Sequence, residues 1–154
     1  MLIKLILVFS LILSSSFAYK KGDVLEANTI SMLNLKKEKV YILDFFASWC
    51  LSCKIEIPLI SKLNTKLDKN KYEIIGIDID EEIKEAISFQ RILKKKNQLN
   101  FNVINDSPNL IVKKFNPIGV PALYIIKNYR VKSAIFGAVN NIDEKIITEL
   151  EKIK

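Results

Sequence analysis

Two cysteines, Cys50 and Cys53, are the only ones in this 154-residue chain. A pair spaced Cys-x-x-Cys can form a redox-active disulfide, supply half of a metal site, or hold a loop together. A metal site needs more ligands, and the chain has no third cysteine and no histidine, which leaves carboxylates or a second subunit. A structural disulfide across so short a loop would remove little entropy from the unfolded chain. We therefore favour a redox pair over the metal and structural interpretations.

The elements around the pair predict where its sulfurs lie. Val40 to Phe46 is apolar on both faces, apart from one aspartate, and is rich in aromatic and branched residues, as in a central covered strand. Helical spacing of apolar residues begins at Cys53. The first turn of a helix stabilises a thiolate through its unpaired amides and its dipole. We expect Cys50 to react with disulfides and Cys53 to resolve the mixed disulfide that forms.

Two acidic residues lie close enough in sequence to move protons for the cysteines. Asp44 lies inside the apolar strand, so we expect a desolvated carboxyl group with a raised pKa that relays a proton to Cys53. Glu56 follows Cys53 by one helical turn and is a second relay or a charge that raises the cysteine pKa. The structural alternative for Asp44 is a partly exposed aspartate at the strand end, and for Glu56 it is an ordinary partner of the helix dipole.

Three further residues near the pair have expected places. Trp49 is predicted to form an apolar flank of Cys50 that contacts substrate, with burial in the core as the alternative. Lys54 is one of many lysines and is expected on the surface. Pro58 is expected to kink the helix.

Downstream, strands and helices alternate after a polar lead-in over residues 19–39. Strand, helix, strand, helix implies a parallel pair with a crossover, and the later pattern adds a hairpin and a closing helix. The first expected elements are a strand over Tyr72 to Ile79, a helix over Glu81 to Asn97 and a strand over Phe101 to Ile104; the apolar stripe of the helix includes Ile83, Ala86, Ile87 and Leu93. A brief helix from Ser107-Pro108 and two strands from Pro121 to Phe136 that turn at Asn128 follow. The last expected element is a helix from Ile142 to Ile153, with Asn141 as a possible cap.

The N-terminus is predicted to be a signal peptide. Lys4 precedes the apolar run Leu5 to Leu13, a serine stretch, and Ser16-Phe17-Ala18, a pattern typical of cleavage after Ala18. The run is short for a membrane span of about 20 residues, so an uncleaved anchor is the alternative. We assign residues 1–18 to the signal peptide and 19–154 to one domain, which export would place in the periplasm or another extracytoplasmic compartment.

Charge and composition exclude several classes of function. The net charge is +7, but the lysines are scattered and no arginine-aromatic pattern accompanies them, so we expect a solvated surface and no nucleic-acid partner. The absence of histidine excludes imidazole metal ligands, haem ligation by histidine, and Ser-His or Cys-His catalytic pairs.

The segment Phe-Ala-Ser-Trp-Cys-x-x-Cys-Lys, with an aspartate before it and a proline after it, resembles the active-site segment of the thioredoxin superfamily. The later segment IGVPALYIIKNYRV resembles that superfamily's cis-proline loop and hairpin. The resemblance implies that Pro121 is cis and close to Cys50, and that the backbone of Val120 faces a bound substrate strand. The order Cys-x-x-Cys-x-x-Glu-x-Pro and the long excursion over residues 80–116 are similar to the TlpA/ResA/DsbE branch of secreted thiol-disulfide oxidoreductases.

The resemblance implies an α/β thioredoxin fold, with a central mixed sheet flanked by helices and an insertion between the second strand-helix unit and the cis-proline loop. It also implies an enzyme of thiol-disulfide exchange without a dissociable cofactor. Its clients would be proteins with cysteines or disulfides, such as apocytochrome c in cytochrome c maturation, and a membrane thiol-disulfide reductase would supply electrons.

The direction of the reaction is inferred from the two acids. Negative charge near the cysteines disfavours the thiolate and therefore destabilises the reduced form, which makes the protein a reductant. A disulfide oxidase or isomerase of the same fold is the first alternative. A non-catalytic module that binds a metal or a peptide is the second.

Overall fold

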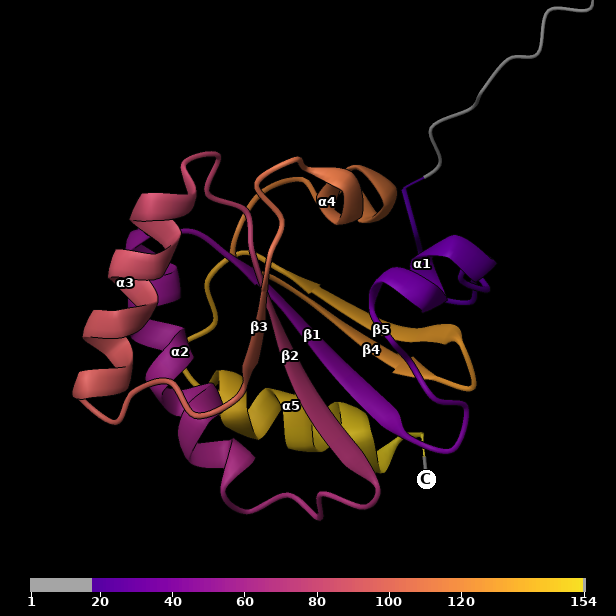
Figure 1. The fold of residues 1–154 in the computed structure, drawn as a ribbon. Coiled ribbons are helices and arrows are strands. Elements are labelled where there is room, and N and C mark those ends of the chain that lie inside the picture. The colour runs from indigo at the N-terminus through magenta and orange to yellow at the C-terminus, as the bar shows by residue number, and fades with distance from the viewer. Residues whose placement is uncertain (1–17, 154) are drawn as a thin grey trace, which may run out of the picture.

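The computed structural model describes residues 18–153, which form a five-stranded sheet with helices on both faces (Figure 1). The strand order is β3-β2-β1-β4-β5, with β1, β2 and β3 parallel and with β4 and β5 antiparallel to their neighbours. The elements are α1 (Ala27–Met32), β1 (Val40–Phe46), α2 (Leu51–Asn64), β2 (Tyr72–Asp78), α3 (Ile83–Lys95), β3 (Asn102–Asn105), α4 (Leu110–Phe115), β4 (Ala122–Lys127), β5 (Arg130–Phe136) and α5 (Ile142–Glu151).

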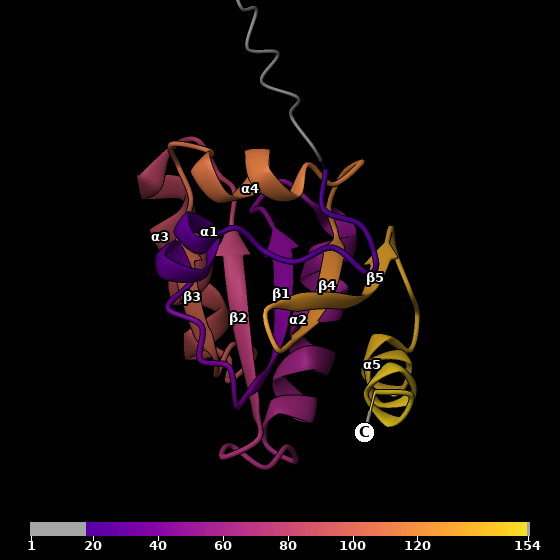
Figure 2. The same cartoon turned by 90° about the vertical axis from the view of Figure 1, so that its right-hand side faces the viewer.

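The central strand β1 is buried along its whole length, as its continuous apolar sequence predicts. Because side chains alternate along a strand, Ile42, Asp44 and Phe46 face one side of the sheet and Leu43 and Phe45 face the other. The first side packs against α2, α3 and α5, and we call its buried residues, which include both cysteines, the cysteine-side core. The second side packs against α4 and the segment around α1. The two views show this division of the helices (Figures 1 and 2).

The lead-in to β1 contains a helix that the sequence did not predict. Its polar composition suggested no regular element, yet Ala27–Met32 forms α1. The surrounding leucines Leu25 and Leu33 are buried, and the Thr29 hydroxyl lies 3.1 Å from the Tyr19 hydroxyl. Backbone bonds to β5 precede the helix, so tertiary contacts rather than helix propensity hold this short segment.

Helix α4 begins later than the sequence predicted. Ser107-Pro108 was expected to start it, but the first helical residue is Leu110. The buried carboxylate of Asp106 accepts amide hydrogen bonds from Leu110 (2.9 Å), Ile111 (3.0 Å) and Val112 (2.7 Å). Asp106 therefore satisfies the free amides of the first turn and decides where α4 starts.

The apolar stripe predicted for α3 is partly wrong. Ala86 and Leu93 are buried as expected, but Ile83 and Ile87 are 40% and 45% exposed. Phe89 is buried instead, so the inward face follows the spacing of Ala86, Phe89 and Leu93. The isoleucines lie at the edge of that face and leave apolar surface on the outside of α3.

The C-terminal part of the fold follows the sequence closely. The hairpin of β4 and β5 turns at Asn128, which has the expected left-handed conformation (φ 53°). Asn141 precedes the first residue of α5, but its side chain makes no capping bond and donates to Glu144 instead.

No helix within residues 18–153 is long and apolar enough to cross a membrane. The predicted signal peptide and its possible role as an anchor fall almost entirely on residues 1–17, outside the described range.

Candidate active site

The two cysteines form a disulfide at the start of α2, with the sulfurs 2.05 Å apart. Cys50 is the residue that precedes the helix, and its sulfur accepts a hydrogen bond of 3.1 Å from the amide of Cys53. The sulfur of Cys50 thus occupies the place of a helix-capping oxygen, where amides and the helix dipole favour negative charge. Cys50 is 6% exposed and Cys53 1%, so the outer sulfur is the one open to attack.

Asp44 is buried in the middle of the sheet, as the sequence predicted. It is 2% exposed, and one of its carboxyl oxygens, Oδ2, has no hydrogen-bond partner among residues 18–153. Desolvation, with a smaller contribution from the negative charge of Glu56, raises the pKa of Asp44 to about 8. Strand alternation directs Asp44 to the same side of the sheet as Cys53, so the carboxyl group and the inner sulfur share the cysteine-side core.

Glu56 is buried in α2 and connects this helix to the chain that precedes α5. Its Oε1 atom accepts a 2.6 Å hydrogen bond from the amide of Val139. Desolvation raises the pKa of Glu56, and the amide of Val139 opposes that shift. This pairing makes Glu56 more than an exposed partner of the helix dipole, which was the structural alternative. The helix runs unbroken through Pro58, and its neighbour Ile57, rather than Ile55, takes the buried position.

Trp49 lies on the surface beside Cys50. It is 65% exposed, so the alternative that placed it in the core is wrong. Lys54 is also exposed, as expected, and its ammonium lies 5.9 Å from the centre of the Phe89 ring. An exposed tryptophan next to a redox-active cysteine offers apolar contact area to a partner.

The bond between Val120 and Pro121 is cis, as the resemblance implied. Pro121 is buried and Val120 is half-buried. Val120 packs against the cysteine-side core that contains Cys50 and Cys53. Cys50, Cys53 and Val120 thus share one core, and the roles of all seven predicted site residues stay predictions.

Ser48 and Asp80 were not predicted to lie near the cysteines. The amide and the hydroxyl of Ser48 both donate to the carboxylate of Asp80, at 2.9 Å and 3.0 Å. Asp80 follows the parallel strand β2, and Ser48 follows β1. The carboxyl ends of parallel strands meet at one edge of a sheet, so this arrangement was a signal that could have been used.

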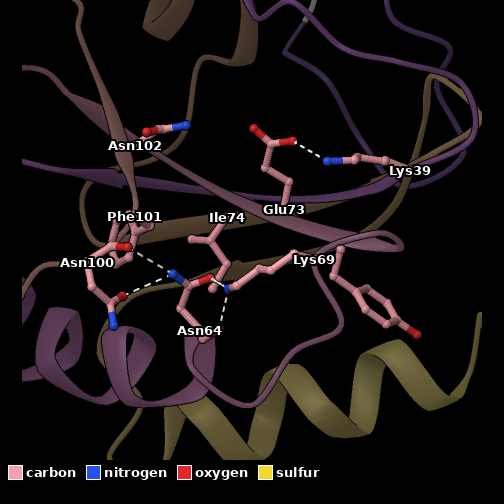
Figure 3. A pocket seen from close by; sticks show the side chains of 9 residues that line it. Lys39, Asn64, Lys69, Glu73, Ile74, Asn100, Phe101 and Asn102 are labelled. Atoms are coloured by element: carbon pink, nitrogen blue, oxygen red, sulfur yellow. Dashed lines mark hydrogen bonds and ion pairs between the residues drawn. The ribbon is translucent and has the colours of Figure 1, made fainter.

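A polar pocket of about 290 Å³ lies at the far end of α2, about 20 Å along the helix from the disulfide (Figure 3). Asn64 donates to the backbone oxygen (3.1 Å) and side-chain oxygen (3.0 Å) of Asn100, and Lys69 donates to the backbone and side-chain oxygens of Asn64. Lys39 pairs with Glu73 on the opposite wall at 3.0 Å. The bonds between Asn64 and Asn100 hold the C-terminal end of α2 against the residues that precede β3, and we assign no ligand to the pocket.

A metal site needs three or four ligand side chains around one point. Residues 18–153 contain no group of three or more cysteine, histidine, aspartate or glutamate side chains placed to hold a metal ion. The two sulfurs are bonded to each other, and carboxylates do not complete a set around them.

Known proteins share both the sequence pattern and the fold. The AhpC/TSA family pattern matches residues 15–132. A thiol-disulfide oxidoreductase, ResA, from Bacillus thuringiensis subsp. konkukian is 30% identical over 130 residues, which span 84% of this chain and 71% of that protein. The chain belongs to the AhpC/TSA family and is a ResA-like thiol-disulfide oxidoreductase. Its activity is thiol-disulfide exchange with client proteins that carry cysteines.

Solved structures confirm the thioredoxin-like fold of this ResA-like protein. A Chlorobium tepidum protein assigned as thiol:disulfide interchange protein DsbE has a TM-score of 0.73 at 18% identity, over 88% of this chain and 98% of that one. A secreted disulfide oxidoreductase from Mycobacterium tuberculosis, homologous to DsbE of E. coli, has a TM-score of 0.61 at 22% identity, over 75% and 83% of the two chains.

Proposed function

We propose that this protein is exported and reduces the disulfides of client proteins outside the cytoplasm. The N-terminal pattern of residues 1–18 supports export by a signal peptide, which leaves residues 19–154 as one domain. Its structural neighbour from Mycobacterium tuberculosis is a secreted protein, which agrees with this location. If the signal peptide stays attached, the domain is tethered to a membrane by its N-terminus.

The hydrogen bond from the Cys53 amide to the Cys50 sulfur is the observation that carries the proposed mechanism. In the reduced protein the same amide and the helix dipole stabilise the Cys50 thiolate. The thiolate attacks one sulfur of a client disulfide, a bond forms between Cys50 and the client, and the client disulfide breaks. The released client sulfur takes up a proton.

Resolution then returns the site to its disulfide form. Cys53 loses its proton and attacks the sulfur of Cys50, and the second client sulfur leaves as a thiol. Two electrons have passed to the client, and a membrane thiol-disulfide reductase supplies two electrons to regenerate both thiols. We assign the proton from Cys53 to Asp44, because a carboxyl pKa of about 8 is close to the usual thiol pKa of about 8.5.

Glu56 supports reduction as the direction of the reaction. The hydrogen bond from the Val139 amide favours the ionised carboxylate of Glu56, and negative charge near the cysteines destabilises a thiolate. A less stable reduced form gives electrons away more readily. Trp49, Val120 and Pro121 would contact the client beside the disulfide. Apocytochrome c, whose cysteines must be reduced before haem attachment, is the client that the family resemblance favours.

The mixed disulfide can be trapped in a Cys53→Ala variant, because no second thiol is left to release the client. The variant is expressed in its own compartment, and the proteins attached to Cys50 are identified by mass spectrometry. Client proteins should be recovered, apocytochrome c among them. The Cys50→Ala variant is the matched control and should capture none. Recovery of no client under conditions in which another oxidoreductase captures its own would contradict the proposal.

An oxidase is the second candidate, and the amide bond to Cys50 is the observation in its favour. A stabilised thiolate also stabilises the reduced form, which gives a more oxidising protein. Equilibration with glutathione decides between the two directions. A reduction potential near that of thioredoxin, about −270 mV, supports the reductase, and one near that of DsbA, about −120 mV, supports the oxidase.

A further inference from the structure

A groove leads away from the redox centre between the start of α2 and the outside of α3. It has a volume of about 560 Å³, and we call it the α2–α3 groove. Trp49 and Lys54 form its α2 side, and Lys84, Phe89 and Ile92 of α3 form the other. Trp49 is the residue before Cys50, so the groove begins beside the sulfur that reacts with clients.

Large apolar side chains are exposed in the walls of the groove, where surface residues are usually polar. Trp49 is 65% exposed and Ile92 is 50% exposed. The Phe89 ring also lines the groove, under the ammonium group of Lys54. Exposed aromatic and aliphatic groups that gather beside a reactive centre are characteristic of a surface that binds a partner.

The rim of the groove carries more positive than negative charge. Lys54 and Lys84 are exposed, and neither forms an ion pair among residues 18–153, while Glu85 is the acidic residue of the lining. Surface lysines without partners attract a carboxylate, and the attraction speeds association more than it strengthens the complex.

A chain of buried and partly buried hydrogen bonds connects the two walls of the groove. The Asp80 carboxylate accepts both donors of Ser48, which fixes the residue before Trp49. The Asp80 amide donates to Asp78 at 3.1 Å, and the Asp78 carboxylate also accepts from Gln90 of α3 at 2.8 Å. The groove is therefore formed before a partner arrives, so binding needs little ordering of its walls.

We propose that the α2–α3 groove binds the client segment next to the attacked cysteine, and that it selects an apolar side chain followed by a carboxylate. The inference rests on the proposed function, because the client must reach Cys50. It extends the client-binding surface from Trp49 to α3 and names a preference that the redox chemistry alone does not require. The apolar group packs against Trp49 and Ile92, and the carboxylate meets Lys54 and Lys84.

The test compares two synthetic peptide disulfides that differ only beside the cysteine. One carries phenylalanine and glutamate, and the other carries serine and glutamine. Reduced Cys53→Ala protein is mixed with each, and the rate constant of mixed disulfide formation is measured by rapid mixing. A small neutral reagent, 2-hydroxyethyl disulfide, reports the intrinsic reactivity of Cys50 without using the groove.

Reversing the charge of the rim lysines distinguishes binding in the groove from the intrinsic reactivity of Cys50. The double variant Lys54→Glu, Lys84→Glu should react about 10-fold more slowly with the phenylalanine-glutamate peptide, after correction for its rate with the small disulfide. Its corrected rate with the other peptide should stay within about twofold. The matched control reverses Lys62 and Lys95, exposed residues of the same two helices outside the groove, and should leave both rates within about twofold.

Each outcome of this experiment is decisive. Equal corrected rates for the two peptides, or an effect of the control variant as large as that of the rim variant, would overturn the groove and leave the proposed function standing. Self-association through the groove would appear as a dimer in sedimentation that the rim variant disrupts, and would equally overturn the client assignment. If the Cys53→Ala protein fails to react even with the small disulfide, the proposed function fails and the client groove with it.

Discussion

The carboxylate of Glu56 helps to raise the pKa of Asp44. Burial is the larger cause, and together they bring the pKa of Asp44 to about 8. Glu56 is held in place by the amide of Val139 at 2.6 Å, whereas one oxygen of Asp44 has no hydrogen-bond partner in the described part of the chain. The two acids therefore differ: Glu56 is fixed by the hydrogen bond from the Val139 amide, whereas Asp44 is poised to take up or release a proton near neutral pH.

The Asp44→Asn variant should change how stability depends on pH. In the unfolded chain this carboxyl group ionises near its ordinary pKa of 3.8, while the folded protein keeps the proton up to about pH 8. Its contribution is fully present below pH 4 and is lost as the pH rises to about 8. At about 1.4 kcal/mol for each pKa unit, the loss over this whole pH range is on the order of 6 kcal/mol.

Asparagine does not ionise, so the free energy of unfolding of the variant should lack this decline with rising pH. The free energy of unfolding is measured with urea at pH 4.5 and pH 8, with the disulfide intact. The exposed aspartate Asp68 provides the control, and Asp68→Asn should keep the decline of the unmodified protein. If the free energy of unfolding of Asp44→Asn falls with pH as steeply as that of the unmodified protein, another group causes the loss of stability.

The Glu56→Gln variant should make the protein a weaker reductant. The amide side chain still offers an oxygen to Val139, but its negative charge is gone, so the Cys50 thiolate and the reduced form become more stable. We expect the thiol pKa to fall and the reduction potential to rise by on the order of 10–30 mV. Titration of the thiolate by ultraviolet absorbance and equilibration with glutathione measure the two quantities.

A matched loss of charge on the surface distinguishes this effect from a general one. Glu151→Gln removes a carboxylate from the exposed end of α5 and should leave the potential unchanged. If Glu56→Gln changes neither the thiol pKa nor the potential, its role is limited to holding the chain at Val139.

The Gly76→Ala variant should be destabilised because there is no room for a side chain beside the site. Gly76 of β2 pairs with Asp44 of β1, and an added Cβ would lie 2.7 Å from the Phe46 ring and 3.1 Å from the Phe101 ring. Forcing a methyl group into a packed core costs about 1–3 kcal/mol. Gly119→Ala is the control, since nothing lies within 4 Å of its added Cβ. Equal free energies of unfolding for both variants would show that the core can expand at Gly76.

Local patterns in the sequence were enough to predict the redox centre. The apolar run of β1 and the helical spacing after it placed Cys50 and Cys53 at the junction of a strand and a helix, and the structure confirms that position. The same run made Asp44 a buried acid. These predictions succeeded because strand burial and helix capping depend on residues that are close together in the chain.

The tertiary structure decided the features that depend on residues far apart in sequence. Asp80 holds Ser48 across 32 positions and Glu56 holds Val139 across 83, and no periodic pattern links either pair. Periodicity also misplaced part of the buried face of α3 because it shows that a helix has an apolar side but not how the neighbouring elements cover it. The sequence by itself determined where the two sulfurs lie, whereas packing decided which acids, lysines and aromatic rings surround them, because those neighbours meet only once the chain has folded.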